Sequence, residues 1–420
     1  MDKIIIQGGR RLKGEISISG SKNAALPLLF ATILTEGTST LHHIPELKDV
    51  LTSLKLLSKL GLHHKKIQTH TYQVQCNNMR SYTATYDLVK TMRASVLVLG
   101  PLLARVRKAK VSLPGGCAIG ARPINLHLKA FEKMGAKIDI QGGYVVASTK
   151  KLHGELIRFD TVTVTGTENV MMAATLAQGE TVIENAAREP EVIDLAQALI
   201  AMGARIEGMG TKTIHIQGVD QLHACQYSII PDRIEMGTFL MGVAITHGDI
   251  TITNAKSSML VALIEKLKEV GVSFEENERG LRAIGPKILK TADITTAPFP
   301  GFATDFQAQF MACMTVAKGT SVITETIFEN RFMHVSELAR MGAKIRVEGH
   351  RAIIEGIPRL SGAPLMASDL RASAALVLAG LNAEGITEIH RVYHIDRGYE
   401  HIERKFRKLG AKIKRVKVKY

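Results

Sequence analysis

Residues 230–285 read IPDRIEMGTFLMGVAITHGDITITNAKSSMLVALIEKLKEVGVSFEENERGLRAIG, and their pattern defines one architectural unit. The first part, to Gly248, has the apolar density of a helix, and the alternation in GDITITNAK predicts a strand. A second helix is expected over 257–271 and a β-hairpin over 272–285. The order helix, strand, helix, hairpin is that of a mixed α/β unit.

The last part of the chain has the same order. A helix is expected over 368–385, a strand over 386–392, a second helix over 399–410, and the counterpart of the hairpin over 411–420. In both units we expect a glycine to end each helix in a left-handed cap. We also expect Asp, Ser or Thr to cap each helix start, where the helix dipole attracts anions.

A short phrase of the type MGAK marks a repeat along the whole chain. Its glycine recurs at positions 61, 135, 203, 271, 342 and 410, with separations of 74, 68, 68, 71 and 68 residues. Six units of about 70 residues therefore account for the chain. Three glycines precede residue 230 and three follow 270, which predicts two domains of three units with a cleft between them. A continuous solenoid is the alternative, but long mixed units without a capping repeat favour two domains.

Composition indicates a globular protein without a membrane span. Of 420 residues, 45% are hydrophobic and 22% charged, and uncharged apolar runs such as residues 94–104 are well short of the roughly 20 residues needed to span a bilayer. The start MDKIIIQGG lacks the apolar core of a secretory signal and is typical of a first strand. Four cysteines without metal or disulfide spacing indicate the cytosol, and we expect no metal. Phosphate-binding glycine motifs are missing, so neither ATP nor NAD is expected and no cofactor is predicted.

The net charge of +15 favours anionic partners. Nucleic acid is disfavoured because aromatic residues make up only 5% and tryptophan is absent. The one dense basic segment, 405–419, alternates like a terminal helix and strand. Small anionic substrates fit better than nucleic acid or a membrane, and the oligomeric state stays open.

The nine residues PGGCAIGAR, 114–122, place the thiol of Cys117 on a glycine-rich turn five residues before the guanidinium of Arg122. A cysteine that serves only in packing usually lies inside an apolar helix or strand. The alternative is a tight turn that happens to contain cysteine. The glycines favour a loop that presents the thiol for chemistry.

Eight segments resemble one family across the entire chain. They are GSKNAALPLLFA (20–31), TMRAS (91–95), SLPGGCAIGARP (112–123), ENAAREPEV (184–192), FATDFQAQF (302–310), ENRFMH (329–334), SDLRAS (368–373) and HIDRGYE (394–400). The resemblance is to the UDP-N-acetylglucosamine 1-carboxyvinyltransferases, the bacterial cytoplasmic transferases (EC 2.5.1.7) of cell-wall biogenesis. It implies transfer of the enolpyruvyl group of phosphoenolpyruvate to the 3'-hydroxyl of UDP-N-acetylglucosamine with release of phosphate. This is the first committed step of peptidoglycan synthesis, on which cell shape and division depend.

The resemblance also implies the fold. It is a two-domain inside-out α/β barrel with helices inside, sheets outside, and three repeats around a pseudo-threefold axis in each domain. One domain would span 22–229 and carry the Cys117 loop. The other would combine 1–21 with 230–420, and the active site would lie in the cleft between the domains.

The reaction adds an alcohol across an enol double bond and then eliminates phosphate from a tetrahedral ketal, so it needs an acid and a base. By resemblance, Cys117 is the proton donor, forms a covalent adduct with phosphoenolpyruvate, and is alkylated by the antibiotic fosfomycin. Nearby Arg122 would favour the thiolate. Asp305 would accept the hydroxyl proton, although its position also suits a helix N-cap. Lys22, Arg122 and Arg397 would clamp phosphoenolpyruvate, and an anion would offset the unfavourable position of Lys22 at a helix start.

The remaining residues that the family assigns to substrates extend this site. The uridine diphosphate side would involve Arg93, residues 122–126, a strand over 161–164, and Ile327. Asp369 and Arg371 match family residues at the reaction centre. Asn125 and Thr161 depart from the family pattern, so nucleotide affinity is expected to differ. Asp396 is interpreted as a surface ion pair and Cys76, Cys225 and Cys313 as packing residues, whereas Glu189 and Asp232 match residues near the cleft. The full set of predicted substrate-binding residues is Lys22, Asn23, Arg93, Arg122, Pro123, Ile124, Asn125, Leu126, Thr163, Val164, Asp305, Ile327, Asp369, Arg371 and Arg397.

Three other functions stay open at this point. The sister enzyme that acts on shikimate 3-phosphate shares fold and reaction but has no equivalent cysteine loop. A silent paralogue would bind the nucleotide sugar without turnover, although Lys22, Cys117, Asp305 and Arg397 are all present. An anion-binding scaffold for nucleic acid would show affinity that falls steeply with salt.

Overall fold

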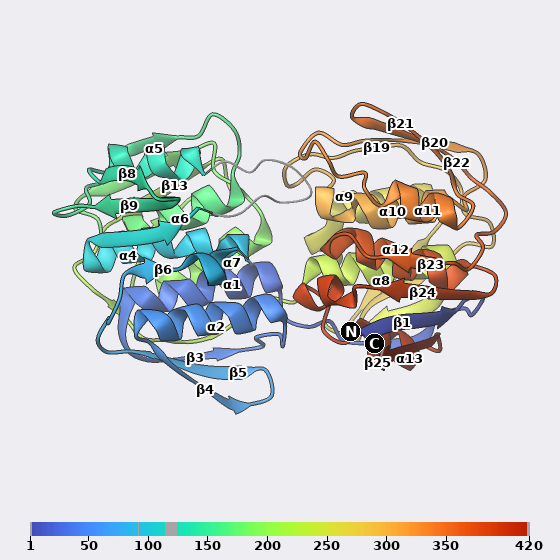
Figure 1. Cartoon of the computed structure of the whole chain (residues 1–420), viewed down its shortest axis with the longest axis horizontal. Helices are drawn as coiled ribbons and strands as arrows, with labels where there is room; N and C mark the ends of the chain where they lie inside the picture. Colours follow the sequence, from blue (N-terminus) through green and yellow to red (C-terminus); the bar gives the residue numbers. More distant parts are fainter. Residues whose placement is uncertain (1, 91, 114–123, 418–420) are drawn as a thin grey trace. The chain divides into compact units, whose positions relative to one another are not determined.

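The computed structural model describes residues 2–90, 92–113 and 124–417. Contacts divide these residues into two units (Figure 1). The N-terminal unit contains the described residues from Gly20 to Ile230. The C-terminal unit contains the segment up to Ser19 together with the described residues from Pro231 onward. Within the described residues, no helix is long and apolar enough to cross a membrane.

Helices and strands follow a repeated order in the N-terminal unit. Its first repeat consists of α1 (Lys22–Ala31), the 3-10 helix η1 (Thr32–Leu34), β3 (Thr35–His42), α2 (Lys48–Leu60), and the hairpin β4 (His63–Gln68) and β5 (Thr71–Cys76). The second and third repeats contain β6 (Thr83–Ala84), α3 (Tyr86–Val89), η2 (Arg93–Val98), α4 (Leu99–Val106), β7 (Lys108–Ser112), α5 (Asn125–Lys133), β8 (Lys137–Gln141), β9 (Tyr144–Ser148), β10 (Leu156–Arg158), α6 (Val164–Ala174), β11 (Glu180–Glu184), α7 (Pro190–Ala201), β12 (Arg205–Glu207), β13 (Thr213–Gln217), β14 (Leu222–His223) and β15 (Gln226–Ser228).

The C-terminal unit has the same order. Its elements are β1 (Asp2–Gln7), β2 (Lys13–Ile16), α8 (Arg233–Thr246), β16 (Asp249–Ile252), η3 (Ser257–Leu260), α9 (Val261–Glu269), β17 (Ser273–Asn277), β18 (Gly280–Ile284), β19 (Ile294–Thr295), η4 (Thr304–Phe306), α10 (Gln307–Met314), β20 (Thr320–Thr324), α11 (Val335–Arg340), β21 (Lys344–Glu348), β22 (Arg351–Glu355), β23 (Pro364–Met366), α12 (Leu370–Asn382), β24 (Ile386–His390), η5 (Val392–Arg397), α13 (Ile402–Lys408) and β25 (Lys412–Lys417).

The sheets of the described residues share one topology. In each, a short edge strand runs parallel to the strand that follows the inner helix, and two further antiparallel strands complete the sheet. These two strands form a hairpin in every sheet except that of β24. In the fourth repeat β2 pairs with β16 in the register Lys13↔Asp249, and β18 and β17 complete the sheet. The predicted hairpin counterpart over 411–420 is wrong in detail, because β25 is its only strand. Its partner is β1, where Ile4 lies between Ile389 and Arg415.

The six glycines of the repeat lie where each outer helix ends. Their φ angles all fall between 89° and 109°, in the left-handed region. The helix-end predictions fail at the inner helices, since α8 ends at left-handed His247 and α12 at extended Ala383. The predicted N-caps are present at Asp232 and Asp369. They are absent from α9 and α13, which begin without a side-chain cap.

The inner helices form the core of each unit. All residues of α8 are buried, and α12 is buried from Arg371 to Leu381. Helices α8, α10 and α12 pack against one another. In the N-terminal unit α6 packs against both α4 and α1, and α4 also contacts η1, which directly follows α1; the sheets lie around these helices (Figure 1). Since a helix that is apolar on every side has to be buried, this inside-out arrangement follows from the sequence. The predicted fold class is confirmed.

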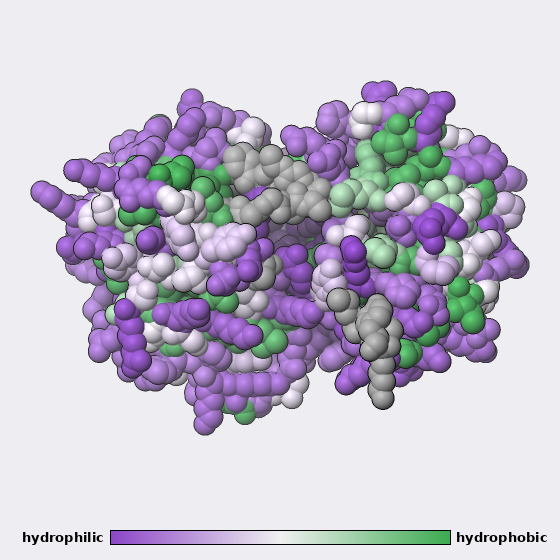
Figure 2. All heavy atoms as spheres, viewed as in Figure 1, coloured by the Kyte–Doolittle hydropathy of each residue, from purple (hydrophilic) through white to green (hydrophobic). Residues whose placement is uncertain are grey.

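The outer strands of the hairpins carry the polar surface. Every residue of β4 is exposed, and β8, β17 and β21 are exposed except for one half-buried residue each. Figure 2 shows mainly hydrophilic residues on the viewed face, with hydrophobic residues scattered among them. These outer strands therefore form a polar, solvent-facing layer over the sheets.

Candidate active site

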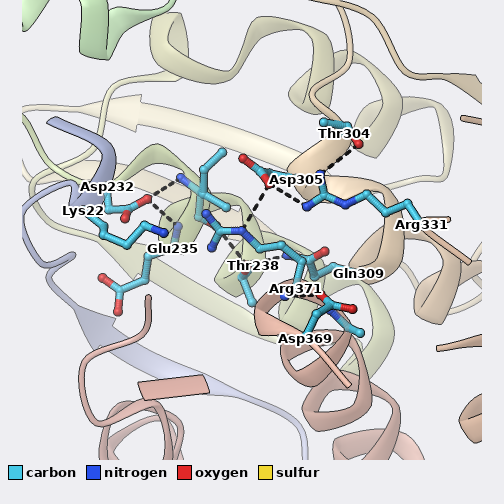
Figure 3. Close-up of polar contacts among 12 residues, drawn as sticks. Lys22, Asp232, Glu235, Thr238, Thr304, Asp305, Gln309, Arg331, Asp369 and Arg371 are labelled. Atoms are coloured by element: carbon cyan, nitrogen blue, oxygen red, sulfur yellow. Dashed lines mark hydrogen bonds and ion pairs between the residues drawn. The ribbon is translucent and has the colours of Figure 1, made fainter. Parts of the chain in front are cut away.

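Three aspartates lie at the starts of the three inner helices of the C-terminal unit (Figure 3). Asp232 caps α8 by accepting hydrogen bonds from the backbone N–H groups of Ile234 at 2.8 Å and Glu235 at 3.0 Å. Asp369 caps α12 in the same way. Asp305 differs, because it lies within η4 and neither η4 nor α10 has a side-chain cap. The interpretation of Asp305 as a helix cap is therefore wrong.

Two buried arginines hold the carboxylate of Asp305 instead. Nη2 of Arg331 donates a 2.7 Å hydrogen bond to Oδ1, and Nε of Arg371 lies 3.4 Å from the same oxygen (Figure 3). The side chains of Arg331 and Arg371 are only 6% and 4% exposed, whereas Asp305 is 30% exposed. The Asp305 carboxylate is thus accessible to solvent, and two buried guanidinium groups determine its orientation.

Arg371 has donor capacity beyond this pair. Within the described part of the chain, its buried Nη1 has no hydrogen-bond partner. Its guanidinium carbon lies 5.5 Å from the centre of the Tyr399 ring, whose hydroxyl interacts with Thr238 and Gln309. A buried donor without an acceptor is unfavourable, so the site suits a ligand that brings an acceptor oxygen.

Ile327, Arg397 and Asp396 are further residues of this unit that the sequence analysis singled out. The backbone N–H of Ile327 donates to Oε1 of Glu325 at 2.8 Å. Arg397 is the half-buried last residue of η5. Its neighbour Asp396 forms a bidentate pair with Arg415 at 2.7 Å for both contacts, so the interpretation of Asp396 as an ion-pair residue is confirmed.

In the N-terminal unit, Lys22 and Asn23 open α1, which Ser21 caps. Nζ of Lys22 lies 3.5 Å from Oδ2 of Asp49 in the first turn of α2, and both side chains are nearly buried. The protein itself therefore supplies an anion that offsets the position of lysine at a helix start. The sequence carries no signal for this pair, because Asp49 lies on the next helix.

The predicted nucleotide side is built around a buried histidine. His127 accepts at Nδ1 from Nδ2 of Asn169 at 3.0 Å, and its Nε2 lies 3.3 Å from Oγ1 of Thr165. The amide orientation of Asn169 follows from its bonds to the Gly100 N–H and the Val96 carbonyl. Burial, with a smaller effect of Arg93, lowers the pKa of His127 to about 4. His127 is therefore neutral near pH 7 and rigidly placed.

Predicted nucleotide contacts surround this histidine in the sequence. Ile124 is the buried residue before α5, whose first residues are exposed Asn125 and half-buried Leu126. Thr163 caps α6 by accepting from the Gly166 N–H, and Val164 is its first residue. The predicted strand over 161–164 is wrong, because the alternating threonines end in this cap; the strand is β10, which ends at Arg158.

Three predicted residues, Cys117, Arg122 and Pro123, lie outside the described residues. The other cysteines match their predicted packing role, since burial raises the pKa of the Cys76, Cys225 and Cys313 thiols. Such thiols are poor nucleophiles.

Sequence reasoning missed several residues around Asp305. Thr304 donates to Glu325, and Arg331 donates to both Thr304 and Asp305. The resemblance drew attention to the segments of Thr304 and Arg331 but not to Glu325. A usable signal was the glutamate directly after the apolar strand that ends at Thr324, since an acid rarely enters a core without partners.

Comparison with known proteins agrees with this architecture. The family model described as EPSP synthase (3-phosphoshikimate 1-carboxyvinyltransferase) matches residues 6–406. A relative in Thermodesulfovibrio yellowstonii, named UDP-N-acetylglucosamine 1-carboxyvinyltransferase, is 57% identical over 99% of this chain and 100% of its own length. One of the same name in Trichlorobacter lovleyi is 58% identical over 99% of both chains.

This chain belongs to the UDP-N-acetylglucosamine 1-carboxyvinyltransferase family. It is accordingly an enolpyruvyl-transferring enzyme with small-molecule substrates. Solved structures show that the fold is shared more widely than the family. The enolpyruvyl transferase NikO from Streptomyces tendae superimposes with a TM-score of 0.88 at 24% identity, covering 99% of both chains. EPSP synthase from Acinetobacter baumannii superimposes with a TM-score of 0.77 at 18% identity, covering 99% of this chain and 100% of that chain.

Proposed function

We propose that the protein transfers the enolpyruvyl group of phosphoenolpyruvate to the 3'-hydroxyl of UDP-N-acetylglucosamine and releases phosphate. The structural observation that carries this proposal is the carboxylate of Asp305, which two buried arginines orient at a helix start that it does not cap. The relatives that match over their full length carry the name of this reaction.

In this proposal, Asp305 accepts the proton of the sugar 3'-hydroxyl while the hydroxyl oxygen attacks C2 of phosphoenolpyruvate. Cys117 donates the proton that reaches C3, and its thiolate can form a covalent adduct at C2. The tetrahedral ketal then loses a proton from C3 and expels phosphate, which restores the enol double bond. General acid–base steps of this kind contribute about 10²- to 10⁴-fold to a rate.

Basic residues would hold the charges of phosphoenolpyruvate. We assign its phosphate and carboxylate to Lys22, Arg122 and Arg397, and the ketal to Asn23. The unmatched Nη1 donor of Arg371 supports an additional contact to a substrate oxygen.

Residues of both units would complete the site, on the assignment that the family resemblance gives. We assign Asp369 and Arg371 to the reaction centre, and the nucleotide sugar to Arg93, Ile327 and the residues that begin α5 and α6. These last residues are Pro123, Ile124, Asn125, Leu126, Thr163 and Val164. Free thiols at Cys76, Cys225 and Cys313 support a reducing compartment, which fits a cytoplasmic enzyme.

The test of this assignment compares two aspartates that each pair with arginine. Asp305→Asn should lower kcat for phosphate release by about 100-fold, because an amide cannot take up the hydroxyl proton. Asp249 pairs with Arg282 through contacts of 2.9 and 2.8 Å and has a similar exposure of 38%. Asp249→Asn should leave kcat within twofold. Equal rates for the two variants would exclude Asp305 as the base.

A further inference from the structure

Glu325 is a buried carboxylate with four hydrogen-bond donors around it. Its side chain follows β20 directly, and the residue is 1% exposed. Oε1 accepts from Oγ1 of Thr296 at 2.9 Å and from the backbone N–H groups of Ile327 at 2.8 Å and Phe328 at 3.2 Å. Oε2 accepts from Oγ1 of Thr304 at 2.8 Å. A buried carboxylate is tolerated only with such partners, and they determine its orientation.

The Oε2 side leads to Asp305. The Thr304 hydroxyl donates its hydrogen bond to Glu325, so the Thr304 oxygen remains available as an acceptor. Nη1 of Arg331 donates to this oxygen at 3.1 Å. Nη2 of the same guanidinium donates to Asp305 at 2.7 Å (Figure 3). Glu325, Thr304, Arg331 and Asp305 are therefore linked by one continuous chain of hydrogen bonds, in which Arg331 donates towards both carboxylates.

The Oε1 side leads to the segment that contains Ile327. Glu325 holds the backbone of Ile327 and Phe328, and the ring of Phe328 has its centre 5.1 Å from the guanidinium carbon of Arg331. Arg331 is thus positioned twice from Glu325, once through Thr304 and once through the Phe328 ring.

We propose that Glu325 is a positioning residue for the transfer reaction, and that it couples the orientation of Asp305 to the segment of Ile327 that receives the nucleotide sugar. This inference rests on the proposed function, which assigns Asp305 as the base and Ile327 as a sugar-nucleotide contact. Glu325 itself touches neither reacting atoms nor substrate. It sets the hydrogen-bond polarity that makes Thr304 an acceptor for Arg331.

The first variant is Glu325→Gln, which keeps the size and one acceptor oxygen. Its amide NH₂ takes the place of Oε2 and donates to the Thr304 oxygen. The Thr304 hydroxyl proton then has no acceptor at this position, and the amide competes with Arg331 for the Thr304 oxygen. We expect kcat to fall at least tenfold and KM for UDP-N-acetylglucosamine to rise several-fold, since misplacement by about 1 Å can reduce a rate about 100-fold. Glu403→Gln, at a glutamate 4% exposed on the outer helix α13, is the matched control and should keep both constants within twofold.

Two variants of Thr304 test the Oε2 side of Glu325 separately from its Oε1 side. Thr304→Val removes only the path to Arg331, so it should lower kcat and leave KM for the nucleotide sugar nearly unchanged. Thr304→Ser retains the hydroxyl and should restore kcat to within threefold. A purely structural role would make the valine and serine variants equal in rate, which would overturn the proposal.

A double-variant cycle distinguishes failure of this inference from failure of the proposed function. If Glu325 acts through Asp305, the variant with both Glu325→Gln and Asp305→Asn should be within twofold of Asp305→Asn alone in kcat. Rate losses that multiply, or a Glu325→Gln enzyme with wild-type kcat and KM, would overturn the positioning role. Wild-type kcat in Asp305→Asn alone would instead remove Asp305 as the base. If kcat of Glu325→Gln were lowered while kcat of Asp305→Asn stayed at the wild-type value, Glu325 could not act through Asp305.

Discussion

Nη2 of Arg331 lies 2.7 Å from Oδ1 of Asp305, although the two residues are 26 positions apart in the sequence. Asp305 therefore takes its orientation from Arg331, in the segment before α11, and from Arg371 in α12, and not from capping the helix on which it stands. Asp305 differs in this from Asp232 and Asp369, whose carboxylates accept hydrogen bonds from the backbone N–H groups at their helix starts. The same starting position in three repeats thus serves capping twice and, in our proposal, catalysis once.

Arg331→Lys tests the value of this contact. A lysine has one nitrogen and cannot donate to Thr304 and Asp305 along the two directions of the guanidinium fork. We expect kcat for phosphate release to fall at least about tenfold, because a displaced base loses its alignment with the hydroxyl. Arg282→Lys, at the exposed pair with Asp249, is the control and should leave kcat unchanged. Equal kcat in the two variants would show that the fork has no catalytic role.

Acid should destabilise the protein through His127. Its pKa is lowered to about 4 by burial, against about 6.5 in the unfolded chain, so the unfolded state binds more protons between these values. Stability is complete above pH 6.5 and is lost as the pH falls towards 4, by about 2 kcal/mol at pH 5. His127→Gln should therefore show a smaller loss between pH 7.5 and pH 5 in urea unfolding. The same loss in both proteins would rule out a neutral buried His127.

Asp194 should act in the opposite direction. Burial raises its pKa to about 6, although its hydrogen bond from Tyr227 at 2.8 Å opposes this shift. The folded state then binds more protons than the unfolded state above pH 3.8, so stability is lost as the pH rises through 6. Asp194→Asn should remove about 1–2 kcal/mol of the decrease between pH 5 and pH 8. Urea midpoints at both values measure it, and parallel midpoint shifts in the variant and wild type would disprove it.

Cys117 should determine the response to fosfomycin. Cys117→Asp replaces the thiol with a carboxyl group, so the enzyme should retain a proton donor and turnover, but the drug should no longer inactivate it. Cys225→Ser is the control, because burial raises the pKa of the Cys225 thiol, and inactivation should be unchanged. Phosphate release after preincubation with the drug measures both. Inactivation of the Cys117→Asp enzyme, or protection by Cys225→Ser, would place the reactive thiol elsewhere.

The repeat was predictable because each outer helix ends in a left-handed turn that glycine adopts without strain. All six marker glycines from Gly61 to Gly410 have this conformation. The inner helices were predictable in position from their apolar density, but not at their ends. His247 takes the left-handed position beside Gly248, although this conformation costs a non-glycine residue about 1–2 kcal/mol. The local sequence therefore favoured Gly248 as the cap.

Long-range contacts in the site were not predictable from local pattern. The partner of β25 is β1 at the other end of the chain, and the partner of Lys22 is Asp49 on another helix. Asp305 could be named only through the family resemblance, since its local sequence fits a helix cap equally well. The role of Glu325 depends on four donors from three segments, which only the fold brings together.

The most direct test of the proposed reaction measures phosphate release from phosphoenolpyruvate with UDP-N-acetylglucosamine, with shikimate 3-phosphate, and with neither acceptor. We expect release that depends on UDP-N-acetylglucosamine and yields an enolpyruvyl ether of the sugar nucleotide in equal amount. Release that depends on shikimate 3-phosphate, or no release with either acceptor, would contradict the account.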